Sequence, residues 1–168
     1  MPRILGIDPG SRLTGFGIID ADGARVRHAV NGAIRTADGP FPQRLRCIFE
    51  QLSQVLDEYR PDAVAVEQVF VNRNVDSALK LGQARGAAIC AAVVRDLPVA
   101  EYAPLQIKQA VVGTGGANKE QVQFMVRALL KISQPLQPDA ADALAVALCH
   151  NQHQPLAQRL ARLQRETT

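Results

Sequence analysis

Paired cysteines are absent from this 168-residue chain. Its three cysteines, Cys47, Cys90 and Cys149, lie far apart, and none belongs to a C-x-x-C pair. The spacing therefore indicates neither a disulfide framework nor a zinc ribbon. Cys90 lies within the apolar stretch GAAICAAVV, so we expect it to be a small buried hydrophobic residue.

Long apolar runs are also missing, since none approaches the ~20 residues that a membrane span requires. The first residues lack the basic and then apolar layout of a secretory signal. We therefore expect a cytoplasmic protein with no membrane partner. The length suits one domain with its own hydrophobic core, which we place over residues 1–155. A basic C-terminal tail follows over residues 156–168, and we expect it to be either disordered or a short frayed helix.

Several catalytic motifs are absent as well. The sequence has no Walker loop, no GxGxxG and no Ser-His-Asp set, so acyl transfer and P-loop chemistry have no candidate residues. His150 and His153 have no third ligand nearby and lie where we expect the last helix to fray, so we do not assign them a metal. The net charge of +3 permits a nucleic-acid partner without requiring one. Of the 19 basic residues, 15 are arginine, which suits bidentate phosphate contacts.

What is present is an alternation of strand and helix patterns. Apolar runs and turn residues predict strands over residues 3–8, 13–20, 25–36, 62–70 and 98–102. Helical periodicity and capping residues predict helices over residues 41–59, 74–96, 104–112, 119–132 and 139–152. This order predicts an α/β layer fold with a mixed sheet. Gly15 and Gly17 alternate in the second strand and leave one of its faces bare, which is typical of a close approach to the backbone.

The helix over residues 74–96 is apolar or small almost all the way round in its second half. Such a helix is usually buried on two sides. One side can lie on the sheet, and the other can meet a second copy of the chain. Gly82 and Gly86, four residues apart, would allow close helix packing. The alternative is a helix buried wholly within one subunit.

Four acids stand out from this frame. Asp8 and Glu67 each end an apolar strand, and Asp139 and Asp142 share one face at the start of an alanine-rich helix. Singly, each has a simpler explanation as a turn former, a solvent-facing strand end or a helix cap. For the four acids together these explanations are weaker, because ordinary turn formers and helix caps have no reason to coincide with the ends of two central strands.

If the four carboxylates meet, burial and mutual repulsion would raise their pKa values unless cations are bound. Oxygen ligands without His or Cys select hard ions such as Mg²⁺ or Mn²⁺. Two such ions about 3.5–4 Å apart form a clamp used for phosphodiester cleavage. The acids therefore predict a nuclease site.

Five segments resemble a known family: GIDPGSRLTGFGIID, AVEQVF, DSALKLGQARGAA, IKQAVVGTGGANKEQVQ and PDAADALAVA. In order and spacing, over about residues 3–150, they are similar to the RuvC Holliday junction resolvases. The resemblance implies an RNase H-like fold, with a five-stranded mixed sheet flanked by helices, and a homodimer. It also implies paired symmetric nicks in a four-way DNA junction, Mg²⁺ dependence and coupling to the RuvAB branch-migration motor.

The same resemblance assigns roles to individual residues. The family's four catalytic, metal-binding acids fall on Asp8, Glu67, Asp139 and Asp142, with two Mg²⁺ expected in each site and Mn²⁺ as a substitute. Its lysines near the scissile strand fall on the pair Lys108 and Lys119. Its aromatic residue that lies against junction bases falls on Phe70, for which a core position is the alternative. Further backbone contacts, or equally a merely solvated surface, are implied for Arg73, Lys80 and Arg85.

The sequence leaves two other classes of protein open. An actin-like or sugar-kinase phosphate loop also begins with an Asp-x-Gly hairpin, but such proteins need at least about twice this length. A module that binds branched DNA without cutting it, or a relative with another nucleic-acid substrate, is the second alternative, because a fold and a metal site do not define the substrate.

Overall fold

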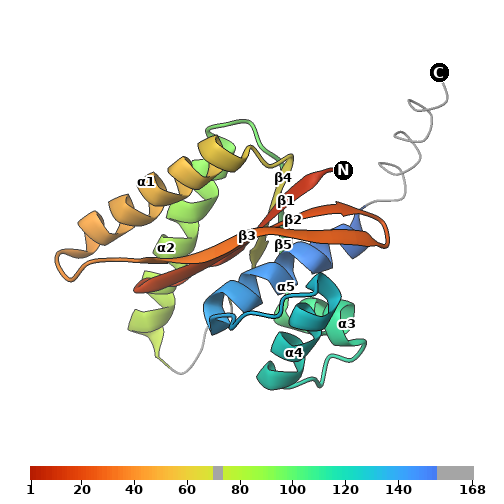
Figure 1. Ribbon diagram of the computed structural model, residues 1–168. Coiled ribbons are helices and arrows are strands. Elements are labelled where there is room, and N and C mark those ends of the chain that lie inside the picture. Colours follow the sequence, from red (N-terminus) through yellow and green to blue (C-terminus); the bar gives the residue numbers. More distant parts are fainter. Residues whose placement is uncertain (70–73, 155–168) are drawn as a thin grey trace.

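A five-stranded mixed sheet runs through the centre of the computed structural model, which describes residues 1–69 and 74–154 (Figure 1). The strand order is β3-β2-β1-β4-β5. β2 pairs antiparallel with both β1 and β3, whereas β4 pairs parallel with both β1 and β5. The predicted mixed sheet is confirmed, with strand bounds β1 Arg3–Asp8, β2 Leu13–Asp22, β3 Arg25–Arg35, β4 Ala63–Glu67 and β5 Val99–Tyr102.

Helices cover both faces of the sheet (Figure 1). Their bounds are α1 Phe41–Tyr59, α2 Val75–Val93, α3 Pro104–Val112, α4 Lys119–Leu130 and α5 Pro138–His153. One core cluster joins α1 and α2 to one face of the sheet, and a second joins α3, α4 and α5 to the other. The predicted helices are confirmed, although two end earlier than expected, α2 at Val93 and α4 at Leu130. After α4, Lys131 adopts a left-handed backbone with φ 55°.

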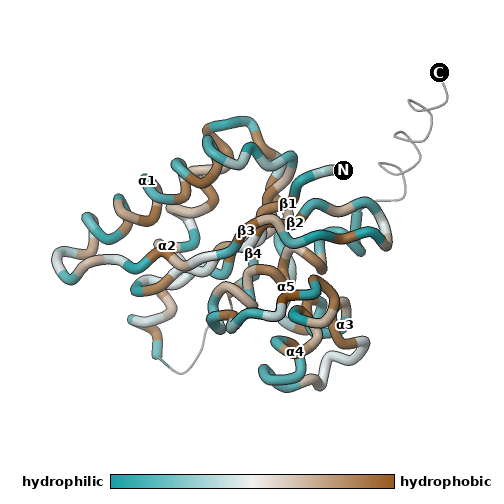
Figure 2. Tube along the Cα trace, viewed as in Figure 1, coloured by the Kyte–Doolittle hydropathy of each residue, from teal (hydrophilic) through white to brown (hydrophobic). Residues whose placement is uncertain are grey.

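The apolar residues gather between these layers, at the sheet and on the inner sides of the helices (Figure 2). Strand β4 is the clearest case, since Val64, Ala65 and Val66 have no exposed surface. A strand covered on both faces reads as an unbroken apolar run, which is why Glu67 at its end is conspicuous. Among the helices that the structure describes, none is long and apolar enough to cross a membrane.

Helix α5 packs unusually close to the sheet because glycines remove the side chains beneath it. A Cβ atom on Gly6 would overlap the backbone of Ala143, and one on Gly15 would overlap the carbonyl of Asp139. A Cβ atom on Gly17 would meet a leucine side chain of α5 at 2.5 Å. The predicted close approach at Gly15 and Gly17 is therefore made by α5, the helix that carries two of the candidate acids.

Helix α2 packs differently and overturns one expectation. Its inner face is an alanine stripe of Ala84, Ala88, Ala91 and Ala92. The predicted burial of Cys90 is wrong, because this cysteine is exposed. The reason is rotational: the alanine stripe takes the contacts with the sheet and α1, so Cys90 projects from another side of the helix. Apolar composition alone did not show which side that would be.

Candidate active site

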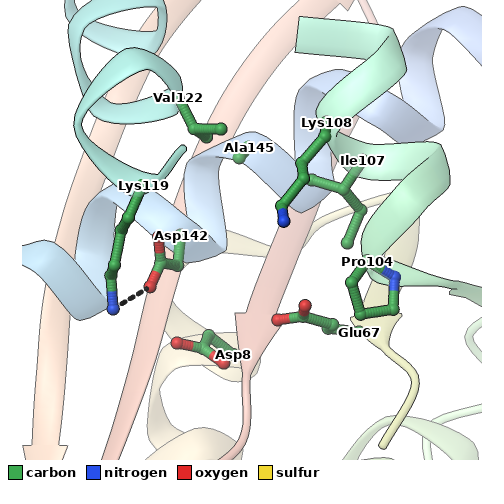
Figure 3. Close-up of a pocket in the computed structure, with 9 residues that line it drawn as sticks. All are labelled: Asp8, Glu67, Pro104, Ile107, Lys108, Lys119, Val122, Asp142 and Ala145. Carbon is green, nitrogen blue, oxygen red and sulfur yellow. Dashed lines mark ion pairs between the residues drawn. The ribbon is translucent and has the colours of Figure 1, made fainter. Parts of the chain in front are cut away.

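Three of the four predicted acids line one pocket at the edge of the sheet (Figure 3). Asp8 ends β1, Glu67 ends β4, and Asp142 lies near the start of α5. Because β1 and β4 are adjacent and parallel, their carboxyl ends reach the same edge, where α/β folds place ligands. The pocket is lined by Asp8, Glu67, Pro104, Ile107, Lys108, Lys119, Val122, Asp142 and Ala145.

Asp139 lies one helical turn before Asp142 and is not among the residues that line this pocket. Its backbone carbonyl packs over Gly15, the residue paired with Asp8 across the β1–β2 ladder. Its negative charge is close enough to raise the pKa of both Asp8 and Asp142. Asp139 therefore belongs to the same electrostatic cluster from the margin of the pocket.

Burial and repulsion shift the acids as the sequence predicts. Burial, and then the charges of Glu67, Asp142 and Asp139, raise the pKa of Asp8 to about 8. Burial is also the main cause of the raised pKa of Glu67, followed by the charge of Asp142, while a hydrogen bond with Asp8 acts in the opposite direction. Burial raises the pKa of Asp142 as well, against the attraction of Lys119. Burial and mutual repulsion therefore disfavour the ionised form of these acids, and Lys119 offsets only part of this effect.

Two lysines enter the pocket from the neighbouring helices (Figure 3). Lys119 Nζ lies 3.2 Å from Asp142 Oδ2, and this carboxylate raises the pKa of the lysine. Lys119 is the first residue of α4, whose start is fixed by the N-cap Asn118, as the side chain of Asn118 accepts from the backbone N–H of Gln121. Lys108 reaches in from α3 (Figure 3). The predicted lysines thus lie beside the predicted acids.

The donor chemistry of the pocket fits a hard divalent cation. Its candidate ligands are carboxylate oxygens at the ends of β1 and β4 and on α5, and a bound cation would relieve the repulsion between them. Over residues 1–69 and 74–154, no three Asp, Glu, His or Cys side chains form a ready metal-binding group. In this arrangement Asp142 is turned toward Lys119. The residues therefore fit the ion in kind and location, with Asp142 paired to Lys119.

Sequence reasoning missed the residue that closes the turn after Asp8. Thr14 is fully buried, and its hydroxyl donates to the carbonyl of Gly10 at 2.9 Å and accepts from the N–H of Gly10 at 3.2 Å. These two bonds close the turn that carries the chain away from Asp8. A hydroxyl in an otherwise apolar strand is the available signal, because a buried hydroxyl needs a partner.

The predicted DNA-contact residues fall into three groups. Phe70 and Arg73 lie outside the described residues. Lys80 is exposed on α2 and pairs with Asp76 at 3.1 Å, one helical turn away. Arg85 is engaged within the chain, with the end of β4 and with an acid of β5. A DNA contact stays a prediction for all four.

The two histidines near the end of α5 lie in an ordered helix that continues to His153, so the predicted fraying before that point is wrong. His150 Nδ1 lies 2.8 Å from the hydroxyl of Tyr102, and His153 Nδ1 lies 2.9 Å from the carbonyl of Cys149. The contact with β5 explains the added order. No metal-binding group includes either histidine in the described part of the chain.

The fold and the site define a class of protein, the RNase H-like nucleases. The defining features are the strand order, the helices on both faces of the sheet and the acid at the end of each of two adjacent central strands. A solved structure of Thermus thermophilus RuvC in complex with a Holliday junction substrate matches with a TM-score of 0.84 and 38% identity, over 89% of this chain and 93% of that one. The yeast mitochondrial Holliday junction resolvase Ydc2 matches with a TM-score of 0.67 over 99% of this chain and 86% of its own, but at 10% identity it shows the fold alone.

The family follows from sequence. The model of the family described as "Crossover junction endodeoxyribonuclease RuvC" matches residues 4–150. Relatives of that name from Alkalilimnicola ehrlichii and Geobacter sulfurreducens are 58% and 62% identical, over 96% and 88% of this chain and 98% and 91% of their own. The chain belongs to this family, which confirms the predicted family, the RNase H-like fold and the predicted enzyme class, a nuclease that hydrolyses phosphodiester bonds and depends on a divalent metal.

Proposed function

We propose that this chain resolves four-way DNA junctions by paired symmetric nicks in two opposed strands. The observation that carries the proposal is one pocket in which three partly buried acids face two lysines, in a chain of the RuvC family. The Thermus thermophilus relative that shares the fold is described in complex with a Holliday junction substrate. The same substrate is the simplest one for a chain that resembles this relative over 89% of its length.

We assign Asp8, Glu67, Asp139 and Asp142 as the ligands that would hold Mg²⁺, two ions to a site, with Mn²⁺ as a substitute. When bound, such ions supply an activated water for in-line attack and stabilise the leaving 3′-oxygen. The residues themselves place four carboxylate groups at one sheet edge and on the first turns of α5. They are held partly buried, so they favour a cation over solvent.

Lys108 and Lys119 complete the site from α3 and α4. Both enter the pocket beside the acids, within reach of a phosphate bound there. Their positive charge would contact the scissile phosphate and stabilise the charge that develops on it during cleavage. Because Lys119 is already paired with Asp142 at 3.2 Å, it also compensates the acid cluster before substrate binds.

Contacts away from the chemistry are assigned to residues after β4 and on α2. Phe70 would stack on an unpaired junction base, an interaction worth about 1–3 kcal/mol per base. Arg73 and Lys80 would contact the DNA backbone, which positions a duplex without reading its sequence. Arg85 is a further candidate for a backbone contact, although its partners within the chain favour another role.

A homodimer is the second part of the proposal. The outer side of α2 exposes large apolar side chains, including Val75, Leu79 and Val93, whose exposed fractions are 64%, 62% and 52%. Among the residues that the structure describes, nothing lies within 4 Å of the position that a Cβ atom would take at Gly82 or Gly86, so none of these residues requires glycine there. A two-fold dimer through α2 would cover this surface and give two active sites of opposite sense, as a junction with two-fold symmetry requires.

Three further assignments stay predictions. The nuclease domain is taken as residues 1–155, with residues 156–168 as a basic tail. Coupling to the RuvAB branch-migration motor is expected from the family. A cytoplasmic location is expected from a DNA substrate.

The test is cleavage of a synthetic four-way junction with Mg²⁺, beside linear duplex of the same sequence. We expect paired symmetric nicks in the junction alone, lost in Asp8→Asn while junction binding persists. Asp57→Asn is the matched control, because Asp57 is an exposed acid of α1 that pairs with Arg95. Binding without cutting by the wild type would indicate a recognition module, and cutting of linear duplex or an RNA–DNA hybrid would overturn the substrate.

A further inference from the structure

The ends of β4 and β5 carry two glutamates that face opposite sides of the sheet. Glu67 faces the pocket formed with α3, α4 and α5. Glu101 is paired in register with Val66 and contacts Arg85 of α2, on the other face. Two acids at neighbouring strand ends therefore have different surroundings, and only Glu67 can take part in the chemistry.

Arg85 connects these two strand ends from behind the pocket. Its Nε donates to the backbone carbonyl of Glu67 at 3.2 Å, and its terminal nitrogen donates to Glu101 Oε1. The Arg85 side chain is 20% exposed, against 46% for Lys80 on the same helix. Charged donors make hydrogen bonds roughly twice as strong as neutral ones, and the planar fork of arginine can hold two acceptors at once.

We infer that Arg85, held by Glu101, is a positioning residue that fixes the end of β4 and so directs the Glu67 carboxylate into the active site. The inference rests on the proposed function of that site. Glu67 is the last residue of β4, and the next backbone N–H, that of Gln68, donates to the carbonyl of Tyr102 at 2.8 Å. Arg85 secures the carbonyl at this point, where the strand ladder ends.

The consequence for catalysis is geometric. A misplacement of about 1 Å at a reacting group can cost about 100-fold in rate. Residues that orient metal ligands typically contribute 10–100-fold in metal affinity or activity. Loss of Arg85 should therefore raise the Mg²⁺ concentration needed for cleavage and increase the mobility of the β4 end. It would not remove any metal ligand.

A phosphate contact by Arg85 makes the opposite prediction. An arginine that contacts DNA contributes to junction affinity, and its loss reduces the salt dependence of binding by about one ion. Glu101 then separates the two roles by sign. If Arg85 contacts phosphate, removal of the negative charge of Glu101 should strengthen junction binding. If Arg85 positions Glu67, the same change should leave junction binding unchanged and raise the Mg²⁺ concentration needed for cleavage.

The experiment compares Arg85→Met and Glu101→Gln with the wild type and with the control Arg95→Met. Arg95 lies just after the C-terminal end of α2 and, like Arg85, is paired with an acid, Asp57 of α1, to which it donates two hydrogen bonds. Three quantities are measured: junction affinity against salt without divalent ions, the Mg²⁺ concentration for half-maximal junction cleavage, and amide hydrogen exchange of residues 63–69 in the metal-free protein.

We expect Arg85→Met to raise the half-maximal Mg²⁺ concentration about tenfold and to speed exchange at the β4 end, with junction affinity within about twofold of wild type. Glu101→Gln should change both quantities in the same direction, less strongly, and Arg95→Met neither. Weaker, less salt-dependent junction binding with unchanged exchange and Mg²⁺ requirement would overturn the inference.

The failure of the proposed function is distinguishable in the same experiment. If the wild type does not cut the junction, the proposed function is wrong, while hydrogen exchange at residues 63–69 still decides whether Arg85 secures β4. If Arg85→Met does not fold, Glu101→Gln decides, because it keeps the side-chain length and removes the charge that holds Arg85. Unchanged exchange and Mg²⁺ requirement in Glu101→Gln would then count against the inference.

Discussion

Helices α5 and α2 lie on opposite faces of the sheet and are both rich in alanine (Figure 1). Ten of the 16 residues of α5 are buried, against four of the 19 residues of α2. In α5 the small residues let the helix lie against bare glycines of the sheet, which brings its acids to the ends of β1 and β4. In α2 only one stripe packs inward, and the other side exposes large apolar side chains. Small residues therefore position chemistry on one face and, we propose, assembly on the other.

The largest expected effect tests the close packing of α5. In Gly15→Val, the added side chain would overlap the carbonyl of Asp139 and push the helix away from the sheet. We expect a loss of about 3 kcal/mol in the free energy of unfolding, measured by urea denaturation, with loss of junction cleavage. The contrast is Gly82→Ala on α2, made in the variant Leu79→Glu that we expect to be monomeric, so that no dimer contact is involved. A Cβ atom at Gly82 meets nothing within 4 Å among the described residues, so the stability should stay or rise by up to about 1 kcal/mol. Equal effects of the two substitutions would refute the comparison.

The second prediction concerns the open side of α2. Leu79→Glu places a charge on an exposed apolar stripe that we propose to be the dimer interface. Sedimentation at micromolar concentration should show a dimer for the wild type and a monomer for the variant, because an unpaired charge is costly to bury. The thermal unfolding of the monomer should remain cooperative, since Leu79 is exposed within one chain. A stable wild-type monomer, or a dimer that tolerates the charge, would contradict this assignment of α2.

How much the sequence revealed differs between these two regions. Asp8 and Glu67 could be found because an acid at the end of an unbroken apolar strand is conspicuous, and the site they predict is at the expected sheet edge. The exposure of Cys90 could not, because alanine, glycine and cysteine give a helix no polar side from which its rotation can be read. The role that we infer for Arg85 could not be predicted either. Its partner Glu101 lies 16 residues away on β5, and only the register between β4 and β5 determines from which face of the sheet Glu101 projects.

A smaller effect is expected from pH. The pKa of Asp8 is raised by burial to about 8, from an unfolded value near 4, so the folded state binds this proton more tightly than the unfolded state. In protein without divalent ions, the stability that protonated Asp8 contributes is fully present below pH ~4 and is lost as the pH rises through about 8. Thermal unfolding between pH 5 and 8 should show a falling Tm for the wild type and a shallower fall for Asp8→Asn. An equal slope in both proteins would contradict the burial of this acid.

The smallest effect is expected at the turn after Asp8. Thr14→Val keeps the shape of the side chain but removes both hydrogen bonds to Gly10 and leaves a backbone N–H without its partner. We expect a loss of about 1–2 kcal/mol in the free energy of unfolding. Thr114→Val is the control, because its hydroxyl accepts from Gly116 in an exposed loop, where water can replace it. A loss in the control as large as in Thr14→Val would remove the special role of the buried hydroxyl.

The central claim, that the α5 face carries a divalent metal site built on repelling acids, is tested most directly by the Mg²⁺ dependence of Tm at pH 8. Wild-type protein should gain stability as Mg²⁺ is added, because a ligand that binds only the folded state stabilises it by mass action. Asp8→Asn should begin from a higher metal-free Tm, since one repelling charge is gone, and should respond to Mg²⁺ weakly or not at all. Equal Mg²⁺ responses in the two proteins, or a lower metal-free Tm in the variant, would contradict the account.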